Sequence, residues 1–450
     1  MMAHVLMGKG LERSRVLTPD RGGSATLVVL LTISLAAVVL ISLQSASLTQ
    51  AAGGREAVAR VRAKWAARAG LEATVARFER NIQNRDAYSV FTEVLDMQDV
   101  ASGSLEGARW SIGHTDDKQD RVGPADAHKK INISRMSNEA LMTLPNMTED
   151  QAASIIDWVD EDDVVSDLGA EDGHYLRLPS PYKPRNGPMR SMAELELVAG
   201  VDALDVRGED WNLNGLLDPT ERDKGESWPD DNGDSVLDAG WSGVVTASSV
   251  DEGLAASGKA RLDLKTATAE QLTARVSGLD STQSKVILDH AFNDGAIMQD
   301  YLGNSLRALA GSGVPAGSVT NLDTEQIIAL LDECTLSDPA AAPKPGRVNI
   351  NTCARETLDY IPELSVAIAD SLVFERNRRA AGFVNMMDLV TELGLSPQTV
   401  SQLAQVLDVR SNAYIVTSKG RDLNTGIEVE VQAVVTRTAL PAPLTEMLVR

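Results

Sequence analysis

The chain has 450 residues, of which 64 are acidic and 42 are basic, so its formal net charge is −22. This charge disfavours partners that present phosphates, such as nucleic acid and anionic lipid headgroups, and favours cations. Hydrophobic residues make up 43% of the chain and charged residues 24%, which is typical of a globular protein, and the length leaves room for a membrane helix and two or three modest domains.

The first element is an apolar stretch, residues 22–54, that contains no charged residue. Its centre, residues 25–43, is long enough to cross a bilayer as a helix. Basic residues precede it, so the positive-inside rule keeps its N-terminal end in the cytoplasm and exports everything after Leu43. These basic residues are Lys9, Arg13, Arg15 and Arg21.

Three kinds of membrane segment compete for this stretch. A cleaved secretory signal has a shorter apolar core, followed by a small-residue cleavage site. A plain signal anchor fits, but the run Arg21-Gly22-Gly23-Ser24 favours a prepilin-type segment, which is processed on the cytoplasmic side at a Gly before the apolar run. We therefore expect cleavage after Gly22 or Gly23, with Gly23 or Ser24 as the first mature residue.

Residues 24–85 predict one long helix. Its first half is apolar all round, and its second half is amphipathic, with apolar residues recurring at threes and fours from Val58 to Ile82. Residues 105–113 then predict a short strand that ends at a Gly.

An internal repeat begins at Ile131, and each copy predicts a short extended opening, a helix, a tight bend and a second helix. The copies cover residues 131–157, 262–290 and 348–407, and the last adds a second hairpin around residues 394–397. Each opening has a polar residue that can accept hydrogen bonds from free backbone donors before the first helix. These residues are Asn132, Asp263 and Asn349.

The C-terminal region follows a different pattern. Residues 413–417 and 427–436 alternate apolar and polar side chains, which predicts a hairpin of antiparallel strands. This hairpin has no helix of its own to cover its inner face, whereas the long N-terminal helix has an uncovered apolar stripe. We therefore predict an α+β fold in which the long N-terminal helix packs on a small antiparallel sheet, with a large inserted all-α domain that contains helix-hairpin-helix-like repeats.

These elements divide the chain into six regions. They are a leader (1–23), a transmembrane and spine helix (24–85), the first part of the core (86–130), the inserted helical domain (131–410), the C-terminal strands (411–440) and a tail (441–450).

The strongest chemical motif is an EF-hand-type loop at residues 210–221. Oxygen ligands fall at positions 1, 3, 5, 9 and 12, a Gly stands at position 6 for the sharp turn, and position 7 offers a backbone carbonyl. Ca²⁺ takes six to eight oxygens in this array. The predicted ligands are Asp210, Asn212, Asn214, Leu216, Asp218 and Glu221.

A second, degenerate loop follows at residues 230–241, with Ser235 in place of the Gly and Trp241 in place of the final Glu. Neither loop has convincing flanking helices, so we expect structural calcium clamps, and the alternative is a pair of solvated acidic loops. The ligands of the second loop would be Asp230, Asn232, Asp234, Val236 and Asp238.

A third acidic cluster lies at Asp157, Asp160 and residues 161–163, with Glu171 downstream. It either ligates a cation or is a solvated helix end. The five His are scattered, and neither an HExxH nor a GxSxG motif occurs, so nothing suggests an enzyme. Cys334 and Cys353 could pair in an exported protein, although two separate thiols are favoured.

The repeats allow a rival interpretation, the DNA-binding helix-hairpin-helix, which grips phosphates with backbone N–H groups in a Gly-rich hairpin. The bends at residues 144–148, 276–280 and 361–365 lack the paired glycines, and two of them carry acids. Together with the net charge, this favours a structural use of the motif and no nucleic-acid partner.

These features together resemble the minor pseudopilin K family (general secretion protein K) of bacterial type II secretion systems. Residues 21–31 resemble its prepilin-peptidase site and hydrophobic segment, and residues 63–73 resemble its post-membrane helix. The most specific run is similar to the family's middle motif and comprises residues 155–160, 169–175, 181–182, 186 and 191–200.

The resemblance implies a pseudopilin core interrupted by a large helical domain that holds calcium, although the loops at 210–238 lie beyond the family's usual motifs. It implies an assembly role, not catalysis, in a single-pass inner-membrane protein with a cytoplasmic N-terminus and a periplasmic bulk. The expected partners are other minor pseudopilins of the I and J types, the major pseudopilin, the inner-membrane secretion platform and the prepilin peptidase.

One departure from ordinary pilins is informative. Counting Ser24 as the first mature residue, the fifth is Val28, not the Glu that can pair with a neighbour's N-terminal ammonium in an apolar fibre core. A subunit without this Glu suits the tip of the filament, where no subunit lies above it. The alternatives are a membrane-anchored DNA-uptake protein that uses residues 348–407, a type IV pilus-like minor pilin, and a calcium-stabilised surface protein with an uncleaved anchor.

Overall fold

The computed structural model describes residues 22–83, 96–116, 119–251, 253–311, 316–338 and 344–450. The chain forms two compact units, residues 1–59 and 60–450. Most of the predicted leader, residues 1–21, lies outside the described residues, as does the segment 84–95 that follows the long helix.

The long helix α1 spans Gly22–Gln83 and confirms the single helix predicted from the sequence. Its N-terminal part, within the unit 1–59, is apolar and exposed, and Leu27, Leu31 and Leu35 are each 64% exposed. The stretch Ala25–Gln83 contains a window with mean hydropathy 2.7 and is long and apolar enough to cross a membrane, by length and composition.

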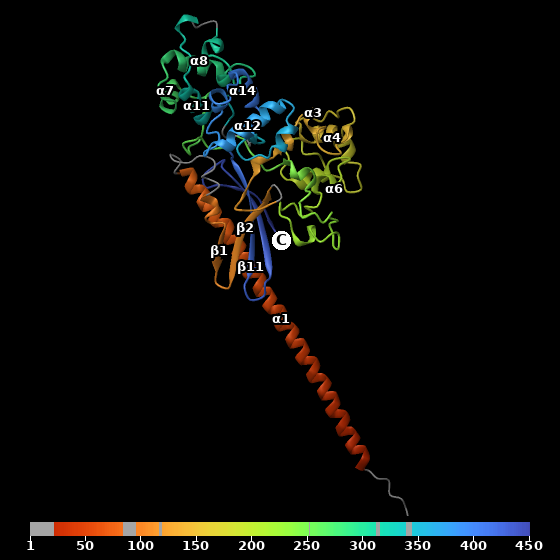
Figure 1. Cartoon of the computed structure of the whole chain (residues 1–450). Coiled ribbons are helices and arrows are strands. Elements are labelled where there is room, and N and C mark those ends of the chain that lie inside the picture. The colour runs from red at the N-terminus through yellow and green to blue at the C-terminus, as the bar shows by residue number, and fades with distance from the viewer. Residues whose placement is uncertain (1–21, 84–95, 117–118, 252, 312–315, 339–343) are drawn as a thin grey trace, which may run out of the picture. The chain divides into compact units, whose positions relative to one another are not determined.

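The second unit contains an antiparallel sheet whose strands come from two distant parts of the chain (Figure 1). The order is β1-β2-β11-β12-β13, with β3 paired to β2 and β4 paired to β11. The strands are β1 (Ser102–Leu105), β2 (Ala108–Asp116), β3 (Gln119–Val122), β4 (Ala125–Asp126), β11 (Ala413–Asp422), β12 (Glu428–Thr436) and β13 (Leu444–Val449).

The sheet corrects two sequence predictions. The strand predicted at 105–113 is two strands, β1 and β2, because Gly107 takes a positive φ of 75° and turns the chain after Glu106. The predicted tail at 441–450 contains β13, which pairs with β12 and forms one edge of the sheet. The predicted hairpin of β11 and β12 is confirmed, and β11 extends five residues beyond its predicted end at Thr417.

The C-terminal part of α1 covers one face of this sheet, as predicted, although Val61 and Trp65 of the predicted apolar stripe are 55% and 60% exposed. Leu71 and Phe78 are fully buried against Tyr414, whose ring meets that of Phe78 edge to face at 5.4 Å. Gly420 of β11 lies directly under the helix: a Cβ added there would come within 1.9 Å of the Ala63 carbonyl oxygen. A residue without a side chain is therefore needed where helix and sheet backbones approach most closely.

The chain between β4 and β11 forms a helical insertion. Most of its helices lie beyond the end of the sheet opposite the β11–β12 turn (Figure 1), whereas its loop at residues 210–221 contacts β2 and β11. Several of its helices begin with a capping box, as at Thr148, Thr268 and Asp280. Its helices are α3 (Asn138–Leu141), α4 (Glu149–Val159), α5 (Asp172–Tyr175), α6 (Ala203–Arg207), α7 (Ala269–Arg275), α8 (Ser281–Ala291), α9 (Asp300–Gly303), α10 (Leu306–Leu309), α11 (Thr324–Glu333), α12 (Val366–Arg378), α13 (Asp388–Thr391) and α14 (Pro397–Leu403).

The three repeats share a feature that the sequence did not predict. The extended opening of each copy pairs in parallel with a two-residue strand that returns later in the chain, so each repeat closes on itself. The pairs are β5 (Ile131–Asn132) with β6 (Val245–Thr246), β7 (Leu262–Asp263) with β8 (Cys334–Thr335), and β9 (Val348–Asn349) with β10 (Leu407–Asp408).

The polar residue in each opening acts as predicted. Asn132, Asp263 and Asn349 each accept a hydrogen bond from the backbone N–H two residues on, at 2.9–3.1 Å. In the third copy the first helix is a short 3₁₀ turn, η8 (Glu356–Tyr360). The first and third copies share one hydrophobic core, whereas the second copy has a core of its own. Cys334 and Cys353 are separate buried thiols, one in each of these cores.

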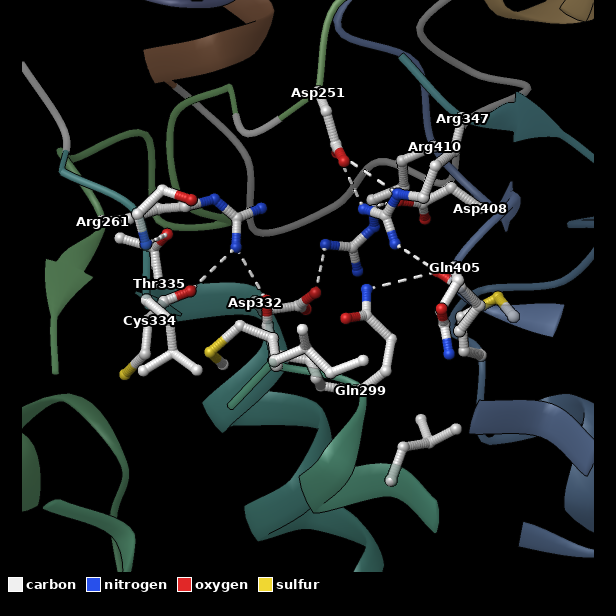
Figure 2. Close-up of a pocket in the computed structure, with 18 of the residues that line it drawn as sticks. Asp251, Arg261, Gln299, Asp332, Cys334, Thr335, Arg347, Gln405, Asp408 and Arg410 are labelled. Atoms are coloured by element: carbon white, nitrogen blue, oxygen red, sulfur yellow. Dashed lines mark hydrogen bonds and ion pairs between the residues drawn. The ribbon is translucent and has the colours of Figure 1, made fainter. Parts of the chain in front are cut away.

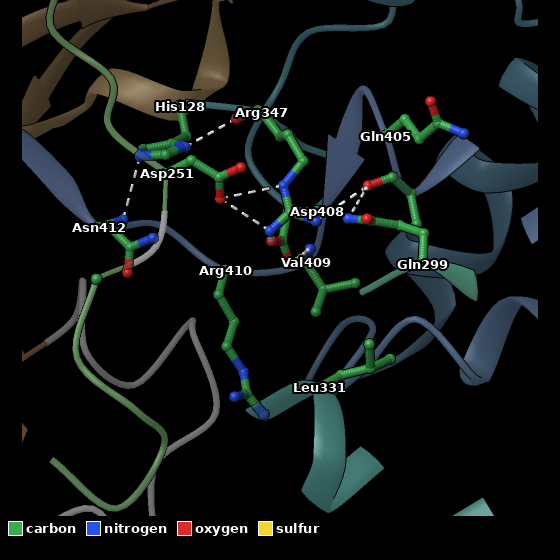
Figure 3. A network of polar contacts seen from close by, with 12 residues as sticks. His128, Asp251, Gln299, Leu331, Arg347, Gln405, Asp408, Val409, Arg410 and Asn412 are labelled. Carbon is green, nitrogen blue, oxygen red and sulfur yellow. Dashed lines mark hydrogen bonds and ion pairs between the residues drawn. The ribbon is translucent and has the colours of Figure 1, made fainter. Parts of the chain in front are cut away.

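A buried polar network joins the sheet to the third repeat. His128 accepts a hydrogen bond from the Asn412 backbone N–H through Nε2, and its Nδ1 lies 2.8 Å from the Arg347 carbonyl oxygen (Figure 3). Asp126 of β4 accepts hydrogen bonds from the Thr352 and Ser411 hydroxyls at 2.5 and 2.6 Å. The insertion is thereby attached to the sheet by specific polar contacts as well as by chain connectivity.

Candidate functional sites

The predicted EF-hand-type loop has the local geometry expected of this motif. Asp210 accepts hydrogen bonds from the Asn214 and Gly215 N–H groups, both at 2.9 Å, and Asn214 accepts one from the Leu216 N–H at 2.7 Å. Gly215 takes a positive φ of 67°, as position 6 of such a loop requires. The side chains of positions 1, 3 and 5 therefore turn inward and hold the chain in a tight loop.

Two carboxylates of this loop, Asp210 and Glu221, are buried. Glu221 is 2% exposed and accepts a hydrogen bond from the Asp218 N–H at 2.8 Å. Burial, followed by the charges of Asp210 and Asp218, raises the pKa of Glu221 to about 7. Burial also raises the pKa of Asp210, which is 3% exposed. A divalent cation among these oxygens would remove the repulsion that the pKa values report.

The loop also lies on the face of the sheet that α1 leaves open. The Thr115 N–H donates to the Gly215 carbonyl at 2.8 Å, and Lys419 donates to Asp218 at 2.6 Å. Thr115 and Lys419 belong to β2 and β11, so the loop spans neighbouring strands. Lys419 already supplies one positive charge to the loop. Burial alone would raise the pKa of Asp218, but the hydrogen bond from Lys419 outweighs this effect, so the pKa of Asp218 is lowered.

The second loop repeats the backbone of the first. Leu213 and Gly215 have positive φ values of 54° and 67°, and the corresponding Gly233 and Ser235 have 70° and 63°. Asn232 accepts from the Asp234 N–H and donates to Asp238, as Asn212 accepts from the Asn214 N–H and donates to Asp218. Asp230, predicted as position 1, is exposed and makes no corresponding contact among the described residues.

Sequence reasoning missed Glu209, which supplies the carboxylate that the second loop lacks. Its two oxygens accept hydrogen bonds from the Asn232 and Asp238 N–H groups at 3.1 and 3.2 Å. The second contact is equivalent to the one that Glu221 makes in the first loop, although Glu209 comes from outside the second loop. The only sequence signal was that Glu209 directly precedes the first predicted ligand, Asp210.

Within the described part of the chain, no group of three or more His, Cys, Asp or Glu side chains is arranged to hold a metal ion. The loops would have to use other donors as well, namely the amide oxygens of Asn212 and Asn214 and the Leu216 carbonyl. Asn and backbone oxygens are ordinary Ca²⁺ ligands, so the donor set fits calcium better than a transition metal.

Two carboxylates of the third acidic cluster, Asp157 and Glu171, are buried, whereas residues 161–163 are exposed. Asp157 is fully buried and accepts the Ser166 N–H at 3.1 Å, and a Cβ on Gly169 would lie 2.1 Å from its Oδ2. Glu171 is 5% exposed, and neither of its carboxylate oxygens has a hydrogen-bond partner among the residues that the structure describes. Burial, followed by the charges of Asp157, Asp160 and Asp163, raises the pKa of Glu171 to about 7. The solvated-helix-end alternative is therefore wrong for Glu171 and Asp157.

This arrangement predicts an unusual pH dependence for the chain freed of metal. The ordinary pKa of a Glu is about 4.5, so the unfolded chain loses the Glu171 proton before the folded chain does. The Glu171 contribution to stability therefore falls as pH rises from about 4.5 to about 7. With a chelator present to remove metal, Glu171→Gln should raise the free energy of unfolding by about 1–3 kcal/mol at pH 8 and change it little at pH 4.5. Urea unfolding measures this free energy. Equal effects at both pH values would contradict this assignment.

The residues with the most specific family resemblance come together around Trp158. Its ring meets those of Tyr175 and Tyr182 edge to face, at 5.2 and 6.2 Å, and its Nε1 donates to Glu194 at 3.0 Å. Glu194 also pairs with Arg185. This cluster lies beside the acidic one, since Asp157 precedes Trp158 on α4 and Glu171 precedes α5.

A cavity of about 440 Å³ lies where the second and third repeats meet the end of the sheet. Arg261 approaches it from one side, and Arg347 and Arg410 approach from the other (Figure 2). Arg347 pairs with Asp251 and Asp408, and Arg410 pairs with Asp332 at 2.7 Å. Sequence reasoning did not find this cavity, because its walls come from several segments spread between Arg135 and Arg437.

The predicted processing residues Gly22 and Gly23 are the first residues of α1, followed by Ser24. The cleavage position stays a prediction.

Comparison with known proteins identifies two regions of the chain. Residues 120–208 match the family described as type II secretion system (T2SS), protein K, and residues 344–408 match the helix-hairpin-helix motif. A stretch of 51 residues is 43% identical to the type II secretion system protein K of Pectobacterium carotovorum subsp. carotovorum; it makes up 11% of this chain and 16% of that relative.

A match is also found among solved structures. It is the GspK-GspI-GspJ complex from the type 2 secretion system of enterotoxigenic Escherichia coli. The match has a TM-score of 0.46 and 13% sequence identity, and it covers 88% of this chain and 99% of the matched chain.

Proposed function

We propose that this chain, which belongs to the type II secretion system protein K family, is the minor pseudopilin at the tip of a secretion pseudopilus. The observation that carries the proposal is the family match over residues 120–208, which contains the Trp158 cluster. Members of this family are structural pseudopilins and are not known as enzymes. The role of the chain is then structural: its surfaces contact other subunits of the pseudopilus.

Two features support the tip position: the residue at position 28 and the size of the helical insertion. Val28 replaces the Glu that an internal subunit would need to pair with its neighbour's N-terminal ammonium. The helical insertion between β4 and β11 adds nearly 290 residues to a small sheet, and such a mass is most easily accommodated where the filament ends.

The membrane role follows from α1. Its apolar N-terminal part would anchor the chain in the inner membrane before assembly, with the N-terminus in the cytoplasm and the bulk in the periplasm. Prepilin peptidase would cleave after Gly22 or Gly23. The partners would be the I-type and J-type minor pseudopilins, the major pseudopilin and the inner-membrane platform.

Calcium is the metal that the acidic loops would hold. In the first loop Asp210, Asp218, Glu221 and the two Asn amides would be ligands, and in the second Glu209 would replace Asp230 as a main carboxylate donor. The orphaned Glu171 carboxylate beside Asp157 supports a further cation at the helical cluster. A bound ion would neutralise buried carboxylates and fix the first loop on β2 and β11.

The tip position can be tested by immunogold labelling of pseudopili that contain an epitope-tagged chain. We expect label at one end of each filament and none along its length. Label distributed along the filament would contradict the tip assignment and leave only the family membership.

A second function, DNA uptake, is favoured by the helix-hairpin-helix match at residues 344–408 alone. Salt-dependent binding of DNA by the purified chain would support it. The two accounts separate cleanly, because a pseudopilin should retain binding to other minor pseudopilins and show no such DNA binding.

A further inference from the structure

The cavity at the meeting point of the second and third repeats has a basic lining, although the chain as a whole is acidic. The chain as a whole carries a net charge of −22, but basic side chains outnumber carboxylates in the lining of this cavity. Its carboxylates are Asp251, Asp332 and Asp408, and each of them is paired with Arg347 or Arg410. The charges of those two arginines are therefore balanced by these carboxylates.

Three further cations in the lining have no such compensation. Arg261 donates to the carbonyl oxygens of Gly253, Leu331 and Cys334 at 2.7–3.2 Å, and Lys344 donates to the Ser337 hydroxyl at 3.0 Å. Among the described residues, neither of these side chains nor Lys265 forms an ion pair with a carboxylate. Their positive charges therefore remain available to a ligand.

The three cations come from segments that lie next to one another. Arg261 and Lys265 flank β7, which pairs with β8, and Ser337, the partner of Lys344, follows β8 by two residues. The carbonyl contacts fix the orientation of the Arg261 guanidinium, whereas both lysines are exposed at the surface. A fixed inner cation with two exposed outer ones is a suitable arrangement for capturing a multiply charged anion.

The rest of the lining adds a chemical requirement. Met298, Met386 and Met387 face the same cavity together with several aliphatic side chains. Methionine adapts its shape to apolar ligands, and a volume of about 440 Å³ falls within the range of small-molecule sites, 300–1,000 Å³. The ligand should therefore have an apolar part as well as more than one negative charge.

We propose that this cavity binds a small organic polyanion, with its anionic groups on Arg261, Lys265 and Lys344 and its apolar part against the methionines. The ligand would bridge the second and third repeats at the point where both meet the sheet. This site is separate from the acidic loops and does not depend on the proposed position at the filament tip.

The test is calorimetric titration of the full-length chain in detergent with glutarate, a dicarboxylate with an apolar centre. Inorganic phosphate and sodium chloride at equal ionic strength serve as comparison ligands. We expect glutarate to bind at least tenfold more tightly than phosphate, and Lys265→Gln/Lys344→Gln to weaken glutarate binding at least tenfold. The matched control is Lys285→Gln, which removes an exposed lysine on α8 and should leave the affinity unchanged.

The lysines are exposed, so the double variant should melt at the same temperature as the parent chain without ligand, and a loss of binding can be assigned to the site. Absence of glutarate binding, or equal binding by parent and double variant, would overturn the proposal. Phosphate binding as tight as that of glutarate would overturn the requirement for an apolar part.

Discussion

Chelation of Ca²⁺ from the full-length chain in detergent should lower its melting temperature by about 3–5 °C, and Asp210→Ala should remove most of this shift. A ligand at 100 times its Kd stabilises the folded state by about 2.7 kcal/mol. Each kcal/mol moves the melting temperature of a chain of 150–250 residues by about 2–4 °C, and that of a chain twice as long by about half as much. Asp210 is the position-1 ligand, and its buried carboxylate makes no ion pair with a basic side chain among the described residues.

The matched control is Asp289→Ala, which removes an exposed carboxylate from α8, far along the chain from the loops. This variant should keep the full calcium-dependent shift. A melting temperature that does not respond to chelation would contradict the proposal that the chain binds calcium. If the shift were unchanged in Asp210→Ala, the calcium site would have to be assigned to the cluster of Asp157 and Glu171 instead of the first loop.

Asp126→Ala should destabilise the chain by about 3 kcal/mol or more, whether or not calcium is present. Asp126 lies at the base of the insertion, where one carboxylate oxygen accepts hydrogen bonds from Thr352, Ser411 and Asn349, and the other accepts the His128 N–H. Removing the carboxylate leaves several buried donors unsatisfied, and each such donor costs about 1–3 kcal/mol. Urea unfolding followed by circular dichroism measures the change.

Two variants show whether the acceptor itself is responsible. Asp126→Asn keeps the size but places an N–H₂ donor where an acceptor is needed, so it should lose nearly as much stability as Asp126→Ala. Asp120→Ala removes an exposed carboxylate from β3, the strand that precedes β4 in the chain, and should change stability by less than about 0.5 kcal/mol. If Asp126→Asn were as stable as the parent chain, the network would not join insertion and sheet as described.

The sequence predicted the elements whose periodicity is strong and long. The apolar stripe from Val58 to Ile82 identified the spine helix, and the alternation in residues 427–436 identified β12, because both patterns persist over many residues. β13 was missed because Leu444, Met447, Leu448 and Val449 are mostly exposed at a sheet edge and do not alternate. The two-residue strands that close the repeats were missed because a strand of two residues has no period to detect.

The loop at 210–221 was found because its chemistry depends on local spacing. Its place on the sheet could not be predicted, since Thr115 and Lys419 are about 100 and 200 residues away in the chain and the contacts that unite them are tertiary. Glu209 was missed for a related reason: a carboxylate outside a loop has no fixed position in the spacing rule. The acidic cluster at Glu171 was recognised as charged, but its burial depends on the packing around Trp158.

The most direct test of the central claim, that this chain is a pseudopilin, is mass spectrometry of its N-terminal peptide. The chain should be isolated from membranes of cells with a working secretion system and prepilin peptidase. We predict a mature chain that begins at Gly23 or Ser24 and has an N-methylated first residue. An intact leader beginning at Met1, with neither residue methylated, would contradict the claim and favour an uncleaved membrane anchor.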